Sequence, residues 1–410
     1  GGTCAVKGCD AKKPLVNASD IVAAFGRLKG KGLAGNAAID WPELIAFKNT
    51  FTDPIPDRER RHLAEAGMPL VEATPRFADP STIVAGNRTL AFDKCLIATG
   101  MIPRPLDFPG ADLMVTSDAF LELPALPGDI VFVGGGYISM EFAHVVARCG
   151  VAVTVVEMTE RILPPFDPDM TDLLTEASRA AGIRIVTESC ISQIERHGER
   201  LAAACLKTGD RFAADTIVHG AGRVPSLEGM ALEAGGVSHS KGGVDVNAFM
   251  QNPGNDNVYA VGDCAASDGL PLTPVANYEA RIAADNMLHG NRRTADYTGI
   301  PSVVFTDPPL AAVGLTAPEA EERNMDVEVR FETMGDRKAL RRLNIDHAGT
   351  KLLVDRGSDR IVGAHILGPG AGEAINAFAM AMRLGLTVTQ LRDVIWTYPT
   401  LTATLVGGVL

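Results

Sequence analysis

A strand, a glycine turn, a helix and a second strand follow one another over residues 129–156, and this unit constrains the fold most strongly. The apolar run at 129–133 predicts a buried strand, and residues 137–149 have the length and pattern of a helix. Another apolar run at 151–156 predicts the second strand. A helix that links two such strands over about 30 residues is typical of a parallel pair. The sequence therefore predicts an α/β fold built on a parallel sheet.

The turn between the first strand and the helix has the spacing Gly134-x-Gly136-x-x-Ser139. In a dinucleotide-binding unit the first glycine makes the tight turn, and the second lets the backbone approach a pyrophosphate at the helix N-terminus. Ser139 occupies the third position, which must be small for the helix to pack on the strand. A glycine turn without a ligand is the alternative, but the strand-turn-helix context favours a dinucleotide site.

An acidic residue follows the second strand at the place where a ribose would bind. Glu157 lies 21 residues after Gly136, and an acid there accepts a hydrogen bond from the ribose 2′-hydroxyl. Glu157 and Glu160 would both repel a 2′-phosphate, which favours NADH over NADPH. Arg161 leaves NADPH open.

Two cysteines near the start of the sequence, Cys4 and Cys9, are separated by five positions. Five positions on a regular helix differ by about 140°, so the thiols meet only if the chain bends between them, which Gly8 permits. Neighbouring lysines would lower a thiol pKa and make it reactive, so the pair is compatible with redox chemistry or with zinc. The other cysteines are single, so we expect no metal site; they are Cys95, Cys149, Cys190, Cys205 and Cys264.

Composition excludes several classes of protein. The chain has 410 residues, a net charge of −12, 46% hydrophobic and 21% charged residues, all ordinary for a globular chain of two or three domains. The negative charge argues against a nucleic-acid partner, and no apolar run reaches the roughly 18 residues of a membrane span. Seven cysteines are too few for a disulfide scaffold, so we expect a reducing compartment such as the cytoplasm.

The remaining pattern predicts domain breaks near residues 118, 245 and 300. Residues 89–100 read as one strand that closes on a glycine. The strand at 258–261 ends in Gly262-Asp263, where the carboxylate could meet a cofactor hydroxyl or lie in a surface turn. Farther on, 351–354 and 361–367 predict an antiparallel hairpin, followed by a helix at 371–384.

Four motifs together resemble those of the flavin-dependent pyridine nucleotide–disulfide oxidoreductases, which include glutathione reductase, dihydrolipoamide dehydrogenase and mercuric reductase. They are GGTCxxxxC at 1–9, LIATG at 96–100, GGGYIxxE at 134–141 and VYAVGD at 258–263. The resemblance covers essentially the whole chain. It implies a homodimer in which electrons pass from nicotinamide through FAD to a disulfide and on to a small-molecule disulfide or metal-ion substrate. The implied fold has two Rossmann-like domains, one FAD-binding at 1–117 and 245–299 that lacks its N-terminal βαβ unit, and one NAD(P)-binding at 118–244. A C-terminal α+β dimerisation domain follows at 300–410.

The resemblance also implies roles for individual residues. Cys4 would attack the substrate and Cys9 would contact the flavin. Lys13 and Glu141 would form an ion pair beside the flavin N5, and Tyr137 would cover the nicotinamide pocket. The other positions implied to bind FAD or NAD(P) are Gly2, Thr3, Ala98, Thr99, Gly100, Gly134, Gly136, Ile138, Glu157, Gly222, Arg223, Gly262, Asp263, Thr273 and Pro274.

Within that set, the resemblance implies that Asp263 binds the ribityl chain of FAD and that Thr273-Pro274 lies along the flavin. The segment 153–167 looks more like the dihydrolipoamide dehydrogenase version than the NADPH-specific one. The resemblance thus agrees with the charge argument for NADH.

Three departures from the family pattern are visible. The family's initial FAD-binding βαβ unit does not precede the cysteines, so we expect a segment upstream of Gly1. Val6 and Ala11 replace the usual Asn and Pro of the redox motif, and Tyr398 replaces the catalytic His of HPTxxE.

These departures keep three functions open. A general acid–base group contributes about 10²–10⁴-fold, so Tyr398 would supply either a weaker acid–base group or a hydroxyl that faces a metal. The three candidates are a disulfide reductase, a reductase of metal ions or quinones, and a truncated, non-catalytic dimer that cannot hold FAD.

Overall fold

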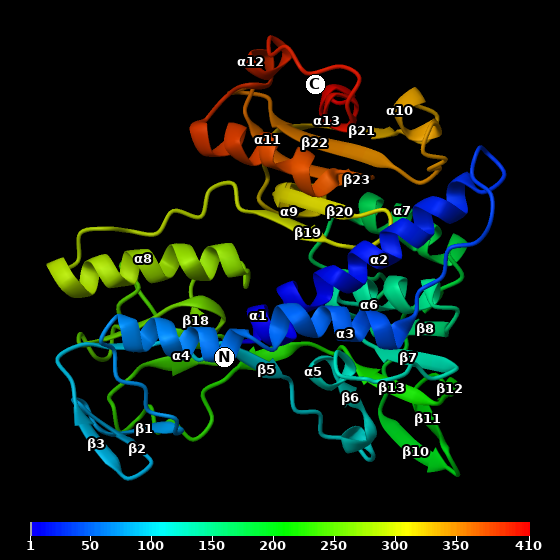
Figure 1. The fold of residues 1–410 in the computed structure, drawn as a ribbon. Helices are drawn as coiled ribbons and strands as arrows, with labels where there is room; N and C mark the ends of the chain where they lie inside the picture. Colours follow the sequence, from blue (N-terminus) through cyan, green and yellow to red (C-terminus); the bar gives the residue numbers. More distant parts are fainter. Residues whose placement is uncertain (1) are drawn as a thin grey trace. The chain divides into compact units, whose positions relative to one another are not determined.

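The structure is a computed structural model that describes residues 2–410 (Figure 1), so Gly1 of the first motif lies outside the described residues. The chain forms two compact units. The first unit comprises Gly1–Asp10, Thr50–Arg104 and Gly222–Tyr297, and the second comprises Ala11–Asn49, Pro105–Ala221 and Thr298–Leu410.

A five-stranded parallel sheet is the first layer of the second unit. Its strands, in spatial order, are β6 (Val115–Thr116), β13 (Thr216–His219), β7 (Asp129–Val133), β8 (Ala152–Val156) and β9 (Arg184–Val186). The strands are nearly continuous apolar runs because both faces of the sheet are covered. The helices of this part are η1 (Ala111–Leu113), α5 (Ser117–Phe120), α6 (Tyr137–Arg148) and α7 (Pro168–Ala180). An antiparallel meander lies between β9 and β13 in the sequence and consists of β10 (Gln193–His197), β11 (Arg200–Ala204) and β12 (Arg211–Ala214). The βαβ unit read from the sequence is therefore confirmed.

A five-stranded antiparallel sheet with helices packed on it forms the C-terminal part of the second unit. Its order is β19 (Pro301–Val304), β20 (Leu310–Gly314), β23 (Ile361–Leu367), β22 (Gly349–Asp355) and β21 (Val327–Thr333). The predicted hairpin is present as β22 and β23, with Lys351 opposite His365. The helices here are α9 (Ala317–Glu322), α10 (Lys338–Arg341), α11 (Ala371–Leu384), α12 (Val388–Arg392) and α13 (Leu401–Gly407).

The first unit consists of small sheets and several helices. Its strands are β1 (Pro75–Asp79), β2 (Thr82–Ala85), β3 (Arg88–Ala91), β4 (Cys95–Ile97), β5 (Met101–Pro103), β14 (Arg223–Pro225), β15 (His239–Ser240), β16 (Gly243–Asp245), β17 (Val258–Ala260) and β18 (Ala265–Ala266). Its helices are α1 (Thr3–Lys7), α4 (Ile55–Glu65), η2 (Gly262–Cys264) and α8 (Thr273–His289), while α2 (Cys9–Leu28) and α3 (Trp41–Thr52) run from one unit into the other.

The prediction of one strand over 89–100 is wrong. The polar pair Asp93-Lys94 interrupts the run, so β3 pairs with β2 in an antiparallel hairpin and β4 pairs in parallel with β17. That parallel pairing brings the ends of the LIATG and VYAVGD motifs to the same sheet edge.

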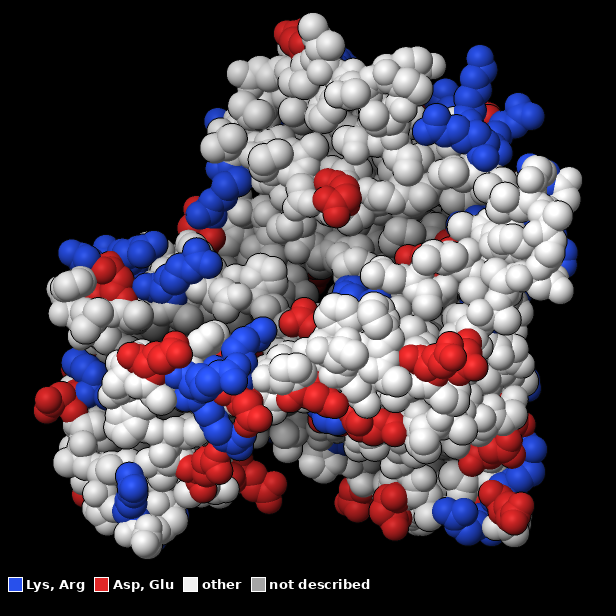
Figure 2. Space-filling view, viewed as in Figure 1, with Lys and Arg blue, Asp and Glu red and all other residues white. Residues whose placement is uncertain are grey.

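Charged residues of both signs are scattered over the visible face in Figure 2, and a group of basic residues lies over α10, which carries Lys338 and Arg341. Among residues 2–410, no helix is both long and apolar enough to cross a membrane.

Candidate active site

The two N-terminal cysteines lie on either side of a helix break. Helix α1 ends at Gly8, whose backbone dihedrals (φ −132°, ψ −123°) are neither helical nor extended, and α2 begins at Cys9. A Cβ at Gly8 would lie 2.8 Å from the Thr3 carbonyl oxygen, so the break requires glycine. Cys4 and Cys9 are thiols in this structure, and their side chains are hydrogen-bonded to each other.

The surroundings of Cys4 favour its protonated thiol over the thiolate. The hydrogen bond with Cys9 and burial both raise the pKa of the Cys4 thiol. The Thr273 hydroxyl, at the start of α8, donates a hydrogen bond to Cys4 Sγ over 2.9 Å and opposes this rise. Cys4 is half-buried and Cys9 is exposed. The pair therefore needs a proton acceptor before Cys4 can act as a nucleophile.

A cavity of about 280 Å³ lies in the first unit, at the end of β17. Gly262 and Asp263 line it, and burial raises the pKa of Asp263. Buried Glu279 holds this wall, because it accepts hydrogen bonds from the Gly262 amide (2.7 Å), the Ser267 hydroxyl (2.6 Å) and the Tyr297 hydroxyl (2.7 Å). A carboxylate beside glycine backbone suits the hydroxyls of a polyol chain, so the residues fit the ribityl part of FAD.

Glu279 is a site residue that the sequence reasoning missed. It lies six positions after Thr273 on α8, with 1% of its surface exposed. Its signal in the sequence was weak, because a single acid on a helix usually faces solvent.

An ion pair occupies the second unit between α2 and α6. The buried carboxylate of Glu141 lies 2.5 Å from Lys12 Nζ and also accepts the Phe305 amide over 3.1 Å. Lys13 Nζ is 4.0 Å from Glu141 and 3.3 Å from the centre of the Phe305 ring. Consecutive helix residues point about 100° apart, and Lys12 is the one that is buried. The expected contact of Lys13 with Glu141 is present at 4.0 Å, and Lys12, which was not predicted, is the closer partner.

Tyr137 is the first residue of α6 and precedes Ile138. It is 45% exposed, and Lys12 Nζ lies 5.7 Å from its ring centre. The ring is thus accessible beside the ion pair, within the same unit.

The glycine turn between β7 and α6 is built for close contact. Gly134 has φ +100°, and a Cβ there would lie 2.4 Å from the Gly220 carbonyl oxygen. Around Gly136 the nearest atom would be 4.0 Å away, which leaves its backbone open to a ligand. The third motif residue, Ser139, is buried against Gly220, where a Cβ would lie 1.8 Å from the Ser139 hydroxyl oxygen. The turn fits a dinucleotide pyrophosphate.

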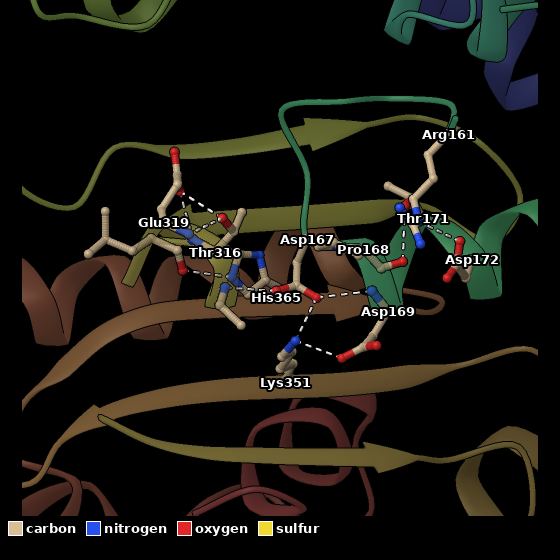
Figure 3. Close-up of polar contacts among 12 residues, drawn as sticks. Arg161, Asp167, Pro168, Asp169, Thr171, Asp172, Thr316, Glu319, Lys351 and His365 are labelled. Atoms are coloured by element: carbon tan, nitrogen blue, oxygen red, sulfur yellow. Dashed lines mark hydrogen bonds and ion pairs between the residues drawn. The ribbon is translucent and has the colours of Figure 1, made fainter. Parts of the chain in front are cut away.

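The carboxylate of Glu157 is fixed at the end of β8. One oxygen accepts the Gly135 amide over 2.6 Å, and the other accepts the amide and hydroxyl of Thr159 over 2.8 and 2.9 Å. Arg161 bonds to Glu160 and, over 3.1 Å, to Asp172; Figure 3 shows the contact with Asp172. The nearby guanidinium is therefore held by two acids.

The other predicted cofactor residues lie in the first unit. Arg223 donates to the Met101 carbonyl over 2.7 Å and to the Thr3 hydroxyl over 3.4 Å. Gly222 directly precedes β14, and Gly2 precedes α1 with φ +99°. Ala98, Thr99 and Gly100 connect β4 to β5, and Pro274 follows Thr273 in the first turn of α8.

Tyr398 lies between α12 and α13 and is 84% exposed. The last histidine of the chain, His365, is 1% exposed in β23, and its Nε2 is hydrogen-bonded to the Leu315 carbonyl over 2.9 Å. His365 is therefore not available to replace the family's catalytic histidine.

Comparisons with known proteins agree with these features. Residues 1–280 match the family "Pyridine nucleotide-disulphide oxidoreductase", and residues 300–407 match its dimerisation domain. Glutathione reductase of Nostoc sp. is 31% identical over 417 residues, which span 97% of this chain and 90% of that protein. Mercuric reductase of Staphylococcus aureus is 30% identical, over 96% of this chain and 73% of its own length.

A solved structure gives the same fold. The HOCl-induced flavoprotein disulfide reductase RclA from Escherichia coli has a TM-score of 0.87 and 28% identity, over 99% of this chain and 90% of that chain. The predicted fold class and the predicted class of enzyme are confirmed. This chain belongs to the pyridine nucleotide–disulphide oxidoreductases, FAD-dependent enzymes that pass electrons from NAD(P)H through flavin and a redox disulfide to a disulfide or metal acceptor.

Proposed function

We propose that this chain is an NADH-dependent reductase of disulfides that uses Cys4 and Cys9 as its redox pair. FAD, when bound, accepts a hydride from nicotinamide and supplies two electrons to the disulfide. The proposal depends chiefly on the contact between the two thiols across the helix break at Gly8.

Cys4 and Cys9 would have different roles, Cys4 as the attacking thiolate and Cys9 as the resolving thiol. The Cys4 thiolate attacks one sulfur of the substrate disulfide, and the other substrate sulfur leaves as a thiolate. Cys9 then displaces the substrate from Cys4 and restores the intramolecular disulfide. Thr273 supports the first step, because its hydroxyl stabilises the charge on Cys4 Sγ from 2.9 Å.

The cofactor sites follow from the same residues. We assign residues 1–117 and 245–299 to FAD binding, 118–244 to NAD(P) binding and 300–410 to the dimer interface, in accord with the family matches at 1–280 and 300–407. Asp263 would bind the ribityl chain of FAD. Glu141, paired with Lys12, would hold a positive charge near the flavin.

The preference for NADH is supported by two observations. Glu157 presents a carboxylate whose position is fixed by three hydrogen bonds, and a ribose 2′-hydroxyl can donate to such an acceptor whereas a 2′-phosphate would be repelled. Arg161, the cation that could bind a phosphate, is paired with Glu160 and Asp172.

A second candidate, the reduction of a thiophilic metal ion, is favoured by Tyr398. A phenol hydroxyl is a weaker proton acceptor than the imidazole of the family motif, so it assists poorly in removing the proton of Cys4, whose pKa is raised. A metal ion bound by two thiolates needs no proton for a leaving thiol. Relatives that carry such names are mercuric reductase and the Cu(II) complex of RclA.

The decisive experiment measures NADH oxidation with glutathione disulfide, lipoamide, Hg(II) and Cu(II) in turn. Tyr398→His should raise disulfide turnover by about tenfold or more and leave metal reduction unchanged, with Tyr398→Phe as the matched control. Disulfide turnover that is fast in the unaltered enzyme and indifferent to both substitutions would refute a role for Tyr398. Retention of activity in Cys9→Ser would refute the proposed function itself.

We also propose a homodimer in a reducing compartment, the cytoplasm. The matched dimerisation domain at 300–407 supports the dimer. Ile395, Leu384 and Met380, all in that domain, are 98%, 72% and 60% exposed, and apolar surface of this kind is typical of an interface. The reducing compartment is supported by the cysteine content, because seven cysteines in 410 residues are too few for a disulfide scaffold.

A further inference from the structure

We propose that Cys190 and Cys205 are a second oxidisable thiol pair, which a hydroperoxide converts into a disulfide next to the segment that carries Glu157. Both residues belong to the second unit, and neither is part of the Cys4–Cys9 motif.

The two cysteines are neighbours because of the meander. Cys190 lies in the connection from β9 to β10, and Cys205 directly follows β11. Strands β10 and β11 are antiparallel, and the Ser192 amide donates to the Ala204 carbonyl over 2.9 Å as the chain enters β10. The Cys190 amide donates a hydrogen bond to the Cys205 sulfur. This contact brings the Cys205 sulfur against the backbone of Cys190, and disulfides form between cysteines whose Cα atoms lie about 4.4–6.8 Å apart.

Exposure assigns different roles to the two sulfurs. Cys190 is exposed, so a dissolved oxidant meets it first. Cys205 is 1% exposed, which protects it from direct oxidation and keeps it as the attacking thiol.

Cys205 is also prepared as a nucleophile. Burial raises its pKa, but hydrogen bonds from Thr208, from Ser189 and from the amides of Thr208 and Cys190 outweigh burial and lower the pKa to about 7. The Asp210 carboxylate competes for the two hydroxyl protons, since it lies 2.6 Å from the Thr208 oxygen and 3.2 Å from the Ser189 oxygen. The two amides cannot turn away, so they keep donating to the sulfur.

Two other cysteines of the chain differ from Cys205 in the direction of their pKa shift. Burial raises the pKa of Cys95 and of Cys149 to about 11. These two thiols therefore serve as internal controls for reactivity.

The oxidation balances in two steps. The peroxide transfers an oxygen atom to Cys190, which loses two electrons and becomes a sulfenic acid, while the peroxide leaves as an alcohol or water. The Cys205 thiolate then attacks the Cys190 sulfur, the S–S bond forms, the S–O bond breaks, and hydroxide leaves and takes up a proton. One peroxide and two thiols thus yield one disulfide, one alcohol or water, and one water.

The pair is connected to the dinucleotide site through the backbone. The Ser189 amide donates to the Glu157 carbonyl over 3.0 Å, and the Glu188 amide donates to the Thr159 carbonyl over 2.8 Å. A disulfide draws Cys190 toward Cys205 and weakens these contacts, so the KM for NADH should rise while kcat at saturating NADH stays the same. This consequence, unlike the disulfide itself, rests on the proposed function.

Peptide mapping of the full-length holoenzyme tests the proposal. Trypsin cleaves after Arg184, Arg196, Arg200 and Lys207, so Cys190 and Cys205 fall on separate peptides, 185–196 and 201–207. After treatment with equimolar hydrogen peroxide, non-reducing mass spectrometry should show these peptides joined, with a mass lower than their sum by two hydrogens. The peptides of Cys95 and Cys149 should remain alkylatable.

Two variants separate the roles of the sulfurs. In Cys205→Ser, Cys190 should accumulate as a sulfenic acid that dimedone traps, and in Cys190→Ser, Cys205 should remain a thiol. Separate peptides with Cys190 still alkylatable, or equal joining of all cysteines, would overturn the proposal.

Kinetics then test the coupling. The KM for NADH should rise about two- to tenfold on oxidation, as expected for losing one hydrogen bond, and the Cys190→Ser variant should not respond. If the peptides are joined but the KM for NADH is unchanged, the coupling between the disulfide and the dinucleotide site is refuted and the disulfide is not. If the untreated enzyme does not oxidise NADH at all, the proposed function is refuted.

Discussion

Single residues set the proton balance of the redox pair. The pKa of Cys4 is raised by Cys9 and by burial, and the Thr273 hydroxyl is the group that opposes this rise. A thiol whose pKa is raised becomes a thiolate only as the pH increases, so its reactivity grows toward alkaline pH.

Disulfide reduction should therefore accelerate with pH, and Thr273 should set how early it does so. Thr273→Val removes the donor and should shift the pH profile of kcat to higher pH, whereas Thr273→Ser keeps a hydroxyl and should leave the profile in place. The measurement is kcat with a disulfide substrate from pH 6 to pH 9.5. A flat profile in the unaltered enzyme would contradict the assignment of Cys4 as the attacking thiol.

Glu157 is the single residue that we expect to discriminate between NADH and NADPH. Glu157→Gln removes the charge but keeps the shape, so the KM for NADH should rise about tenfold, as expected for a hydrogen bond to a charged group. The KM for NADPH should fall, because the repulsion of the 2′-phosphate is lost. Steady-state kinetics with both cofactors give the comparison, and Glu176→Gln, at an exposed acid of α7, is the control. An unchanged ratio of the two KM values would remove Glu157 from the site.

Elements are joined within the second unit by a buried ion pair. Asp167 caps the N-terminus of α7, and its carboxylate accepts Lys351 of β22 over 2.8 Å and the Ala317 amide over 3.0 Å. Lys351 also meets Asp169 over 2.6 Å, as Figure 3 shows. Burial raises the pKa of Asp167, but the bonds from Lys351 and Ala317 outweigh it and hold the pKa below its ordinary value.

Removal of one partner of this pair should be costly. Lys351→Met leaves Asp167 as a buried, uncompensated charge and should lower the free energy of unfolding by about 3–5 kcal/mol. The exposed pair of Arg58 and Glu59 is the control, since Arg58→Met should cost less than about 1 kcal/mol. Urea denaturation followed by circular dichroism measures both.

The pH dependence of the same pair has a definite sign. Asp167 has a lower pKa in the folded state than in the unfolded state, so its stabilising contribution is complete above about pH 4. The contribution is lost as the pH falls further. Stability that did not depend on Lys351 at any pH would show that the pair contributes nothing.

Sequence reasoning succeeded for the elements whose pattern is local. The strand at 129–133, the hairpin of β22 and β23 and the helix Ala371–Leu384 match the expected segments. Lys12 and Glu279 were missed because each is charged and yet buried by contacts that come from distant segments. Neither the hydrogen bond that Glu279 accepts from the Gly262 amide nor the closer approach of Lys12 to Glu141 can be read from spacing alone.

The whole molecule is expected to work as a pair of chains. Light scattering should give twice the 43.2 kDa mass of one chain. Ile395→Asp should shift the equilibrium to monomers, because a charge cannot be buried without a partner, whereas Leu288→Asp, on a residue that is 77% exposed in the first unit, should not. A monomeric unaltered enzyme would refute the homodimer.

The close approach of α6 to the segment after β13 links two positions that lie far apart in the sequence. A side chain at Gly220 would need the space that the Ser139 hydroxyl already fills. The two residues thus divide a fixed volume, so the size allowed at one depends on the size at the other. Covariation is the evolutionary consequence: lineages of this family should place alanine at position 220 where position 139 has lost its hydroxyl and become alanine or glycine.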